Sequence, residues 1–252
     1  MKKIIFLFVI TAVICFVIAT VNNDPAAAIY ALLKKGPIKE GNLVYRIYAF
    51  GFIPIGNAKI NKAAAEIYNG NSVYHLSAAA KSANYLSRIF NATGQLDSYI
   101  DAQTHNPIAY RQRVSIANKD WAVKEIAYDQ QNATMTIAGV KRQILPNTQD
   151  SLSAIYNIRL IDLNKVRDFE VFLNTNQKNY LMKGSVSAQT VTAGNKIFKI
   201  AVANAEIKRY DGNPHHKSKI SIIMLKDHAN IPALIKVFAS GAMISAKLIE
   251  IE

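Results

Sequence analysis

The sequence has 252 residues, of which 50% are hydrophobic and 19% are charged, and this composition favours a packed core over intrinsic disorder. The formal net charge of +13 predicts attraction to anionic surfaces such as phospholipid headgroups, lipopolysaccharide or acidic glycans. A solvated basic face explains the same surplus equally well. Nucleic acid is disfavoured as a partner, because no basic stripe is interleaved with aromatic residues.

The N-terminus has the pattern of an export signal. Lys2 and Lys3 precede an apolar run over Ile4–Val21, and small residues follow at Ala26–Ala28. A charged region, an apolar region and an A-x-A-like cleavage site are typical of a secretory signal peptide. An uncleaved anchor is the alternative, because the apolar run approaches the length of a membrane-spanning helix. Both alternatives predict that the domain is exported to the periplasm of a Gram-negative-type bacterium. In the second alternative it stays anchored to the inner membrane.

We therefore expect residues 1–28 to be the signal peptide and residues 29–252 to form a single β-rich domain. Contact with the membrane would occur through the N-terminal segment alone, and only if that segment stays uncleaved. Cys15 is the one cysteine, and it lies inside the apolar run. After cleavage the chain would contain no disulfide, no cysteine metal site and no cysteine nucleophile, so burial of apolar side chains must stabilise the domain.

From Leu43 onward the hydrophobic pattern has a period of two residues. The segment LVYRIYAF alternates and is rich in residues that favour strands, and GFIPIGNAKI follows it. Pro54 and Gly56 lie in this second run, and proline is confined to edge strands and bulges, so we expect an irregular border of the sheet here. Further strands are expected at Val73–Ala80, Leu96–Ala102, Ile108–Ile116, Trp121–Tyr128, Thr134–Ala138, Val140–Leu145, Asp168–Asn174, Tyr180–Val186, Lys196–Ile207, Lys219–Lys226, Ala233–Ala239 and Met243–Ile251.

Two segments have helical spacing instead. SANYLSRIF, at residues 82–90, places its apolar residues on one helix face. DSLSAIYNIRL, at residues 150–160, does the same, and Asp150 can serve as its N-cap. The whole pattern predicts a mainly β fold, namely an antiparallel, open or incomplete β-barrel or sandwich with one or two short helices covering an end or seam. We expect the second helix to plug the β structure; a helix that gates a ligand cavity is the alternative.

Four segments in order resemble an exported bacterial family classified only as domain of unknown function 3108. They are EGNLVYRIYAFGFIPIGNAKI, LDSYIDAQTHNPIAY, QDSLSAIYNIRL and LKDHANIPALIKVFASGAMISAKL, and they span Glu40 to Leu248. The resemblance implies an envelope protein with a signal peptide and a largely antiparallel, β-barrel-like fold, and it implies no activity. The family tends to carry two acidic residues before the "IP" element, whereas His228 follows Asp227 here. This departure puts in doubt any role that requires both carboxylates.

Two sets of residues are candidates for binding. Asp211, His215 and Asp227 could meet at a hairpin and form a ligand set that zinc accepts, although adjacent histidines in a polar loop are usually solvated. We expect no cofactor.

If the barrel keeps an apolar cavity, basic residues at its mouth would suit an anionic lipid head, and a core filled by side chains is the alternative. The candidate ligand-binding residues are Arg46, Arg88, Arg111, Arg113 and Tyr156.

Three functions are compatible with these observations. The first is a non-catalytic envelope protein that binds a lipid or other amphiphile or supports envelope assembly. The second is a hydrolase that acts on envelope glycan or lipid, for which the sequence offers no recognisable catalytic set. The third is a structural domain that docks on another envelope protein through an exposed sheet edge. The sequence favours the first, with a lipid, an anionic envelope surface or an envelope protein as partner.

Overall fold

The computed structural model describes residues 41–61, 63–86, 91–117, 119–162, 165–175, 177–193, 196–211, 217–226, 228–239 and 241–252. The expected signal peptide lies outside these residues, as do residues 87–90 of the predicted helix at 82–90 and several loop positions. Within the described ranges, no helix combines the length and the apolar character that crossing a bilayer requires.

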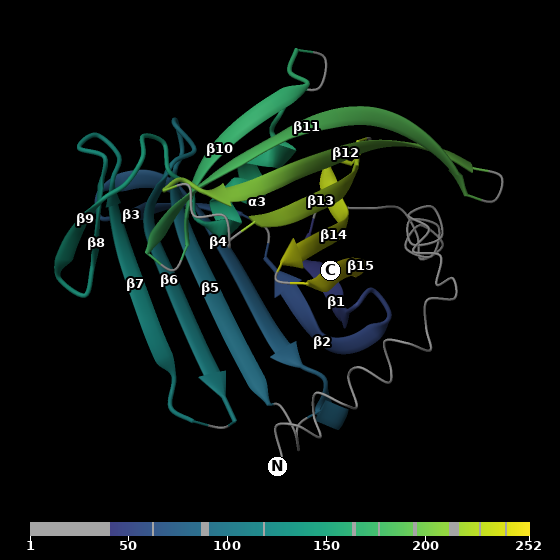
Figure 1. The fold of residues 1–252 in the computed structure, drawn as a ribbon, viewed down its shortest axis with the longest axis horizontal. Coiled ribbons are helices and arrows are strands. Elements are labelled where there is room, and N and C mark those ends of the chain that lie inside the picture. Colours follow the sequence, from purple (N-terminus) through teal and green to yellow (C-terminus); the bar gives the residue numbers. More distant parts are fainter. Residues whose placement is uncertain are drawn as a thin grey trace.

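The described strands form one 15-stranded antiparallel sheet (Figure 1). Its order is β10-β11-β12-β13-β14-β15-β1-β2-β4-β5-β6-β7-β8-β9, and β3 pairs with β4 beside this path. The strands are β1 Leu43–Ala49, β2 Ile53–Ile60, β3 Ala64–Tyr68, β4 Asn71–Ser82, β5 Ala92–Asp101, β6 Pro107–Ile116, β7 Ala122–Asp129, β8 Thr134–Ile137, β9 Val140–Gln143, β10 Asp168–Thr175, β11 Lys178–Ala193, β12 Lys196–Arg209, β13 Lys217–Leu225, β14 Ile231–Ala239 and β15 Ala242–Ile251. Within the described ranges, the helices are the 3₁₀ helix η1, Asn84–Leu86, and the α-helix α3, Ser151–Arg159.

The sheet curves strongly but does not close, because β9 and β10 end the strand order without pairing with each other (Figure 1). The last strand, β15, pairs with the first, β1, in antiparallel register, so the C-terminal segment lies beside the N-terminal strand. The expectation of an antiparallel, open barrel-like fold is confirmed.

The helix α3 lies inside the curve of the sheet, between two groups of strands (Figure 1). Just before it, Gln149 forms a parallel bridge to Leu173 of β10. The backbone N–H of Gln149 donates to Phe172 at 2.7 Å, and that of Asn174 donates to Gln149 at 2.9 Å. The edge of β10 is therefore bonded to the segment that leads into α3.

Both sides of α3 are packed. Ala154 and Ile158, one helical turn apart, join the core formed by strands β10 to β14. Leu152 and Tyr156, also one turn apart, contact a second cluster on β4 and β5 that includes Ile100. The short helix thus fills the space between the β10–β14 wall and the β4–β5 wall, which side chains of the strands alone do not fill.

The hairpin β1–β2 corrects one expectation. β2 is an interior strand between β1 and β4, not a border of the sheet. Its irregularity is a register shift beside Ile47, and Pro54 pairs with β1 there but lies outside the β2–β4 ladder, which runs from Gly56 to Ile60. The proline's missing N–H is therefore not needed by β4. The strand β3 was not expected, and the described part of the 82–90 segment forms only η1.

Candidate functional site

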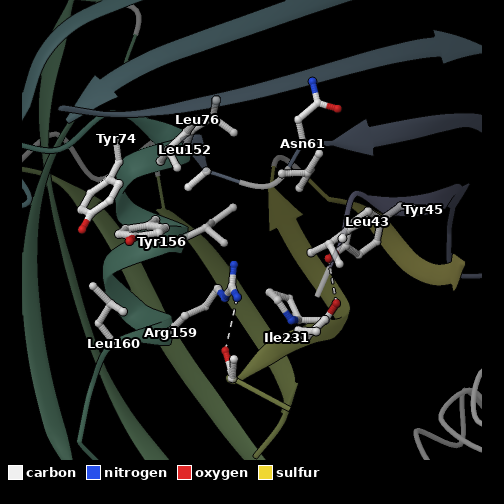
Figure 2. Close-up of a pocket in the computed structure, with 16 residues that line it drawn as sticks. Leu43, Tyr45, Asn61, Tyr74, Leu76, Leu152, Tyr156, Arg159, Leu160 and Ile231 are labelled. Carbon is white, nitrogen blue, oxygen red and sulfur yellow. Dashed lines mark hydrogen bonds between the residues drawn. The ribbon is translucent and has the colours of Figure 1, made fainter. Parts of the chain in front are cut away.

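A cavity of about 350 Å³ lies between α3 and the strands β1, β4 and β14 (Figure 2). Apolar side chains form most of its lining: Leu43, Ile60, Leu76, Leu152, Ile155 and Ile231. These residues come from segments far apart in the sequence, and they meet because the sheet curls around the helix. An apolar space of this size can hold a small apolar ligand or the apolar part of a larger one.

Alternation along the strands directs these side chains inward. Leu43 and Tyr45 on β1 face the cavity, whereas Arg46 points to the opposite face of the sheet. The hydroxyl of Tyr45 donates to the carbonyl of Pro232 at 2.8 Å, a buried bond between β1 and β14. Burial raises the pKa of Tyr45 far above its usual value, although Arg159 lowers it, so this phenol stays neutral.

The helix contributes the side of the cavity that faces β1 and β4. Leu152, Ile155, Tyr156 and Arg159 follow the i, i+3, i+4, i+7 pattern and so share one helix face. The ring of Tyr156 lies 6.3 Å from that of Tyr74, centroid to centroid. Burial raises the pKa of Tyr156 as well, with a further contribution from Tyr74. This helix face combines aliphatic surface with the phenol of Tyr156, which lies near the ring of Tyr74 on β4.

Arg159 is the one charged residue among the lining residues that the structure describes. Its Nη2 donates to the carbonyl of Ala229 at 3.2 Å, and its own carbonyl accepts from Nδ2 of Asn230 at 2.7 Å. A cation in the last turn of α3 also complements the negative end of the helix dipole. Sequence reasoning missed Arg159, although its position three residues after Tyr156 on the same helix face could have identified it.

The start of α3 is fixed by a buried carboxylate. Asp150 accepts hydrogen bonds from the N–H groups of Leu152 and Ser153, at 2.8 and 3.0 Å, and from the hydroxyl of Ser98 on β5 at 2.6 Å. Burial raises its pKa, while these three hydrogen bonds lower it in part. Burial also raises the pKa of Tyr110, which lies on the neighbouring strand β6, to about 12. The expected N-cap is confirmed, and it attaches the helix to the β4–β5 wall.

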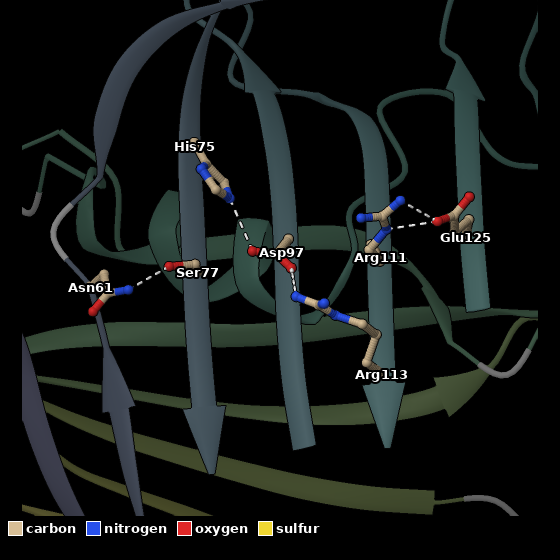
Figure 3. A network of polar contacts seen from close by, with 7 residues as sticks. All are labelled: Asn61, His75, Ser77, Asp97, Arg111, Arg113 and Glu125. Atoms are coloured by element: carbon tan, nitrogen blue, oxygen red, sulfur yellow. Dashed lines mark hydrogen bonds and ion pairs between the residues drawn. The ribbon is translucent and has the colours of Figure 1, made fainter. Parts of the chain in front are cut away.

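The predicted basic residues that the structure describes lie away from the cavity. Arg111 binds Glu125, with Nε–Oε1 and Nη2–Oε1 distances of 2.7 and 2.5 Å, and Arg113 lies 3.8 Å from Asp97 (Figure 3). Both arginines are on the face of β6 opposite Tyr110, which is directed toward α3. Arg46 also faces outward, and Arg88 is outside the described residues. Of the five predicted ligand-binding residues, the structure places Tyr156 in the cavity.

A histidine joins this outer network (Figure 3). Nε2 of His75 lies 3.0 Å from Oδ1 of Asp97, and its ring stacks on Tyr99 at a centroid distance of 4.5 Å. Tyr68 stacks on Tyr99 in turn, at 4.0 Å. These contacts connect β3, β4 and β5 across the outer face.

The predicted metal set is only partly within the described structure. Asp211 follows β12 and accepts a hydrogen bond from Nη2 of Arg209. His215 and Asp227 lie outside the described residues. The predicted metal set therefore stays a prediction, because the structure describes only Asp211 of its three members.

Comparisons with known proteins place these features in context. The family model described as "Protein of unknown function (DUF3108)" matches residues 44–243. Among solved structures, a β-barrel-like protein of domain of unknown function DUF1849 from Brucella abortus is similar, with a TM-score of 0.58 and 9% sequence identity, over 85% of this chain and 98% of that one. This likeness concerns the fold alone.

Lipoprotein LppX from Mycobacterium tuberculosis aligns over 90% of this chain and 93% of its own, at 10% identity. Its TM-score of 0.24 is too low to support an argument about fold or function. No curated protein matches the sequence.

Proposed function

Since the chain belongs to the DUF3108 family, whose description assigns no function, we propose one from the cavity: the protein binds the apolar part of a lipid or other amphiphile beneath α3. The observation that carries this proposal is the lining. It is mainly aliphatic, and the one charged side chain among the described lining residues, Arg159, lies in the last turn of α3, on the same helix face as Tyr156. Ligand sites typically combine an apolar interior with a few placed polar groups.

The polarity of the lining suggests how an amphiphile would be oriented. Its chain would contact Leu43, Leu76 and Leu152, and its polar head would lie near Arg159. Removing apolar surface from water contributes about 25 cal/mol per Å², so burial of the chain supplies most of the affinity. The role is non-catalytic in this proposal: the protein holds or carries the amphiphile.

The proposed setting is the cell envelope. The charged and apolar pattern of residues 2–21 is typical of an export signal, and envelope proteins encounter lipids in aqueous surroundings. A cavity that shields an acyl chain from water would be useful there. The basic composition would favour contact with anionic envelope surfaces.

Native mass spectrometry of the exported protein, purified without detergent, tests the proposal. We expect an additional mass of the size of a lipid or other amphiphile that is released when the protein is denatured. After delipidation, lauric acid should bind with a stoichiometry of one. A delipidated protein that takes up neither lauric acid nor an envelope lipid extract would contradict the proposed function.

Variants that fill the cavity test its role in binding, and a surface variant with the same kind of substitution is the control. Ile155→Trp places a larger side chain in the cavity from its half-buried position on α3, so lauric acid binding should fall at least tenfold. Ala63→Phe fills the cavity from the strand side and serves if the helix variant does not fold. Val123→Trp is the control, because Val123 is 56% exposed and lies outside this cavity. Unchanged binding in both filled variants would place the ligand elsewhere.

A further inference from the structure

The outer face of the sheet carries a row of basic residues behind the cavity. In the paired strands β1, β2 and β4, Arg46 is the partner of Asn57, and Asn57 is the partner of Lys81. On the other side, Lys247 of β15 is the partner of Arg46. Paired residues of neighbouring strands share one face, and Tyr45, next to Arg46, faces the apolar cavity. The row therefore lies on the opposite side of the sheet from the proposed lipid site.

A second cavity, of about 360 Å³, lies over part of this row. Arg46, Asn57 and Lys81 line it, together with Tyr85 of η1. It shares no lining residue with the apolar cavity. The hydroxyl of Tyr85 donates to the carbonyl of Pro54, which holds the aromatic ring beside the basic side chains. The site is therefore a concave surface with cationic, amide and aromatic groups.

Local backbone geometry creates the concavity. Gly56 is buried, and a Cβ built on it would lie 2.5 Å from the backbone oxygen of Lys81. Only glycine allows β2 and β4 to approach this closely. The β2–β4 ladder ends at Gly56 and Ser82, and beyond this end the hydroxyl of Tyr85 in η1 donates to the carbonyl of Pro54.

The charges of the row are not neutralised by described neighbours. Neither Arg46 nor Lys81 forms an ion pair or a side-chain hydrogen bond with any residue that the structure describes, unlike Arg111 and Arg113 on the same face. Two strand spacings separate Arg46 from Lys81, so their Cα atoms are roughly 10 Å apart. Two side chains of this length can converge on one anion above Asn57.

We propose that Arg46, Asn57 and Lys81 bind a phosphate group, either as a free phosphate ester or as a phospholipid headgroup. A phosphate monoester carries up to two negative charges and three acceptor oxygens. The guanidinium of Arg46 supplies a planar pair of donors, Lys81 supplies a compact positive charge, and the amide of Asn57 donates between them. The inference stands independently of the lipid proposal, because the two sites have no residue in common.

Titration calorimetry with inorganic phosphate and glycerol 3-phosphate, and flotation with phosphatidylglycerol or phosphatidylcholine vesicles, test this site. The variant carries Arg46→Gln and Lys81→Gln, which replace two exposed side chains and should not disturb folding. The matched control carries Lys141→Gln and Arg142→Gln on β9, which remove the same charge from exposed positions at the far end of the sheet. Thermal unfolding checks that both variants are folded.

We expect the first variant to lose at least tenfold in affinity and the control to bind as the parent does. Binding of both soluble phosphates would assign the site to free phosphate esters. Binding of phosphatidylglycerol vesicles alone would assign it to headgroups. An equal loss in the control would show that net charge, not this site, attracts the anion, and that result would overturn the proposal. So would an absence of binding to every probe at low salt.

Discussion

At the scale of single residues, Asp150 connects the helix to the sheet. Its side chain is 1% exposed and accepts bonds from Ser98, which is 52 residues earlier, and from two N–H groups of α3. Its own N–H donates to the hydroxyl of Ser153 at 2.9 Å, which completes a capping box. One carboxylate therefore satisfies the first turn of the helix and attaches that turn to β5.

Replacing Asp150 by alanine should destabilise the protein by about 2–4 kcal/mol, since the helix loses its N-cap and Ser98 loses a buried partner. Urea unfolding monitored by circular dichroism measures this change. Asp120→Ala is the control, because Asp120 is exposed and such surface substitutions usually change stability by about 0.5 kcal/mol or less. Equal stabilities of the two variants would show that the cap contributes little.

The raised pKa of Asp150 predicts a pH dependence with a definite sign. Burial, the largest cause, raises the folded-state pKa above the unfolded value of about 3.9, so the folded protein binds a proton more readily. The resulting stability is complete below about pH 4 and is lost as the pH rises through the folded-state pKa.

Comparing the parent with Asp150→Asn isolates this effect, because other titrating groups cancel in the difference. The free energy of unfolding of the parent minus that of the variant should decrease as the pH rises from about 4 and then level off. Urea unfolding at a series of pH values provides the data. A difference that increases with pH would mean that the hydrogen bonds to the carboxylate outweigh its burial.

At the scale of strands, the glycines of β2 and β5 have different roles. A Cβ on Gly56 would meet the backbone of β4, whereas a Cβ on Gly94 of β5 would have its nearest contact at 3.8 Å, an ordinary distance. We expect Gly56→Ala to destabilise by about 1–3 kcal/mol through overpacking, and Gly94→Ala to be neutral or to stabilise by up to about 1 kcal/mol.

Thermal unfolding of both variants measures these changes, and phosphate titration of Gly56→Ala adds a second measurement. Because the glycine also shapes the outer cavity, its replacement should weaken phosphate binding while Gly94→Ala leaves it unchanged. Comparable melting temperatures for the two variants would mean that β2 and β4 separate without cost.

The sequence predicts most of these strands for a physical reason. Alternation and turn residues act over a few positions, so β1, β6 and β15 match their expected ranges closely. The strand β3 has the sequence AAEIY, in which only two residues favour strands, and pairing with β4 rather than local preference stabilises it. Pro54 misled the prediction for β2, because the proline lies outside the ladder with β4.

The site was less predictable than the strands, because its contacts are long-range. The bond from Tyr45 to Pro232 joins residues 187 positions apart, and no local pattern indicates it. Charge alone suggested Arg111 and Arg113, but strand parity directs them outward, toward acidic partners on the same face. Tyr156 was identified because helical periodicity is a local signal.

At the scale of the whole molecule, one curved sheet has two surfaces with different chemistry. Its inner surface and α3 enclose an apolar cavity, and its outer surface behind β1 carries the basic row. Tyr45 and Arg46 are consecutive residues that serve the opposite surfaces. An amphiphile in the inner cavity and a phosphate on the outer face would therefore bind to opposite surfaces of β1, β2 and β4 without competing for side chains.

Hydrogen exchange of the whole protein tests whether the inner cavity unites these distant segments. A ligand that binds only the native state stabilises that state by about 2.7 kcal/mol when its concentration is 100 times its dissociation constant. Amides that exchange only after the site opens should then exchange roughly a hundredfold more slowly. With lauric acid bound, the amides of α3, the start of β1 and the start of β14 should exchange more slowly together, because each contributes lining residues. The β8–β9 hairpin contributes none and should exchange as before. Protection confined to β8 and β9, or equal in all strands, would contradict a ligand beneath α3. Protection of the three lining segments alone would show that the bound ligand stabilises them as one unit.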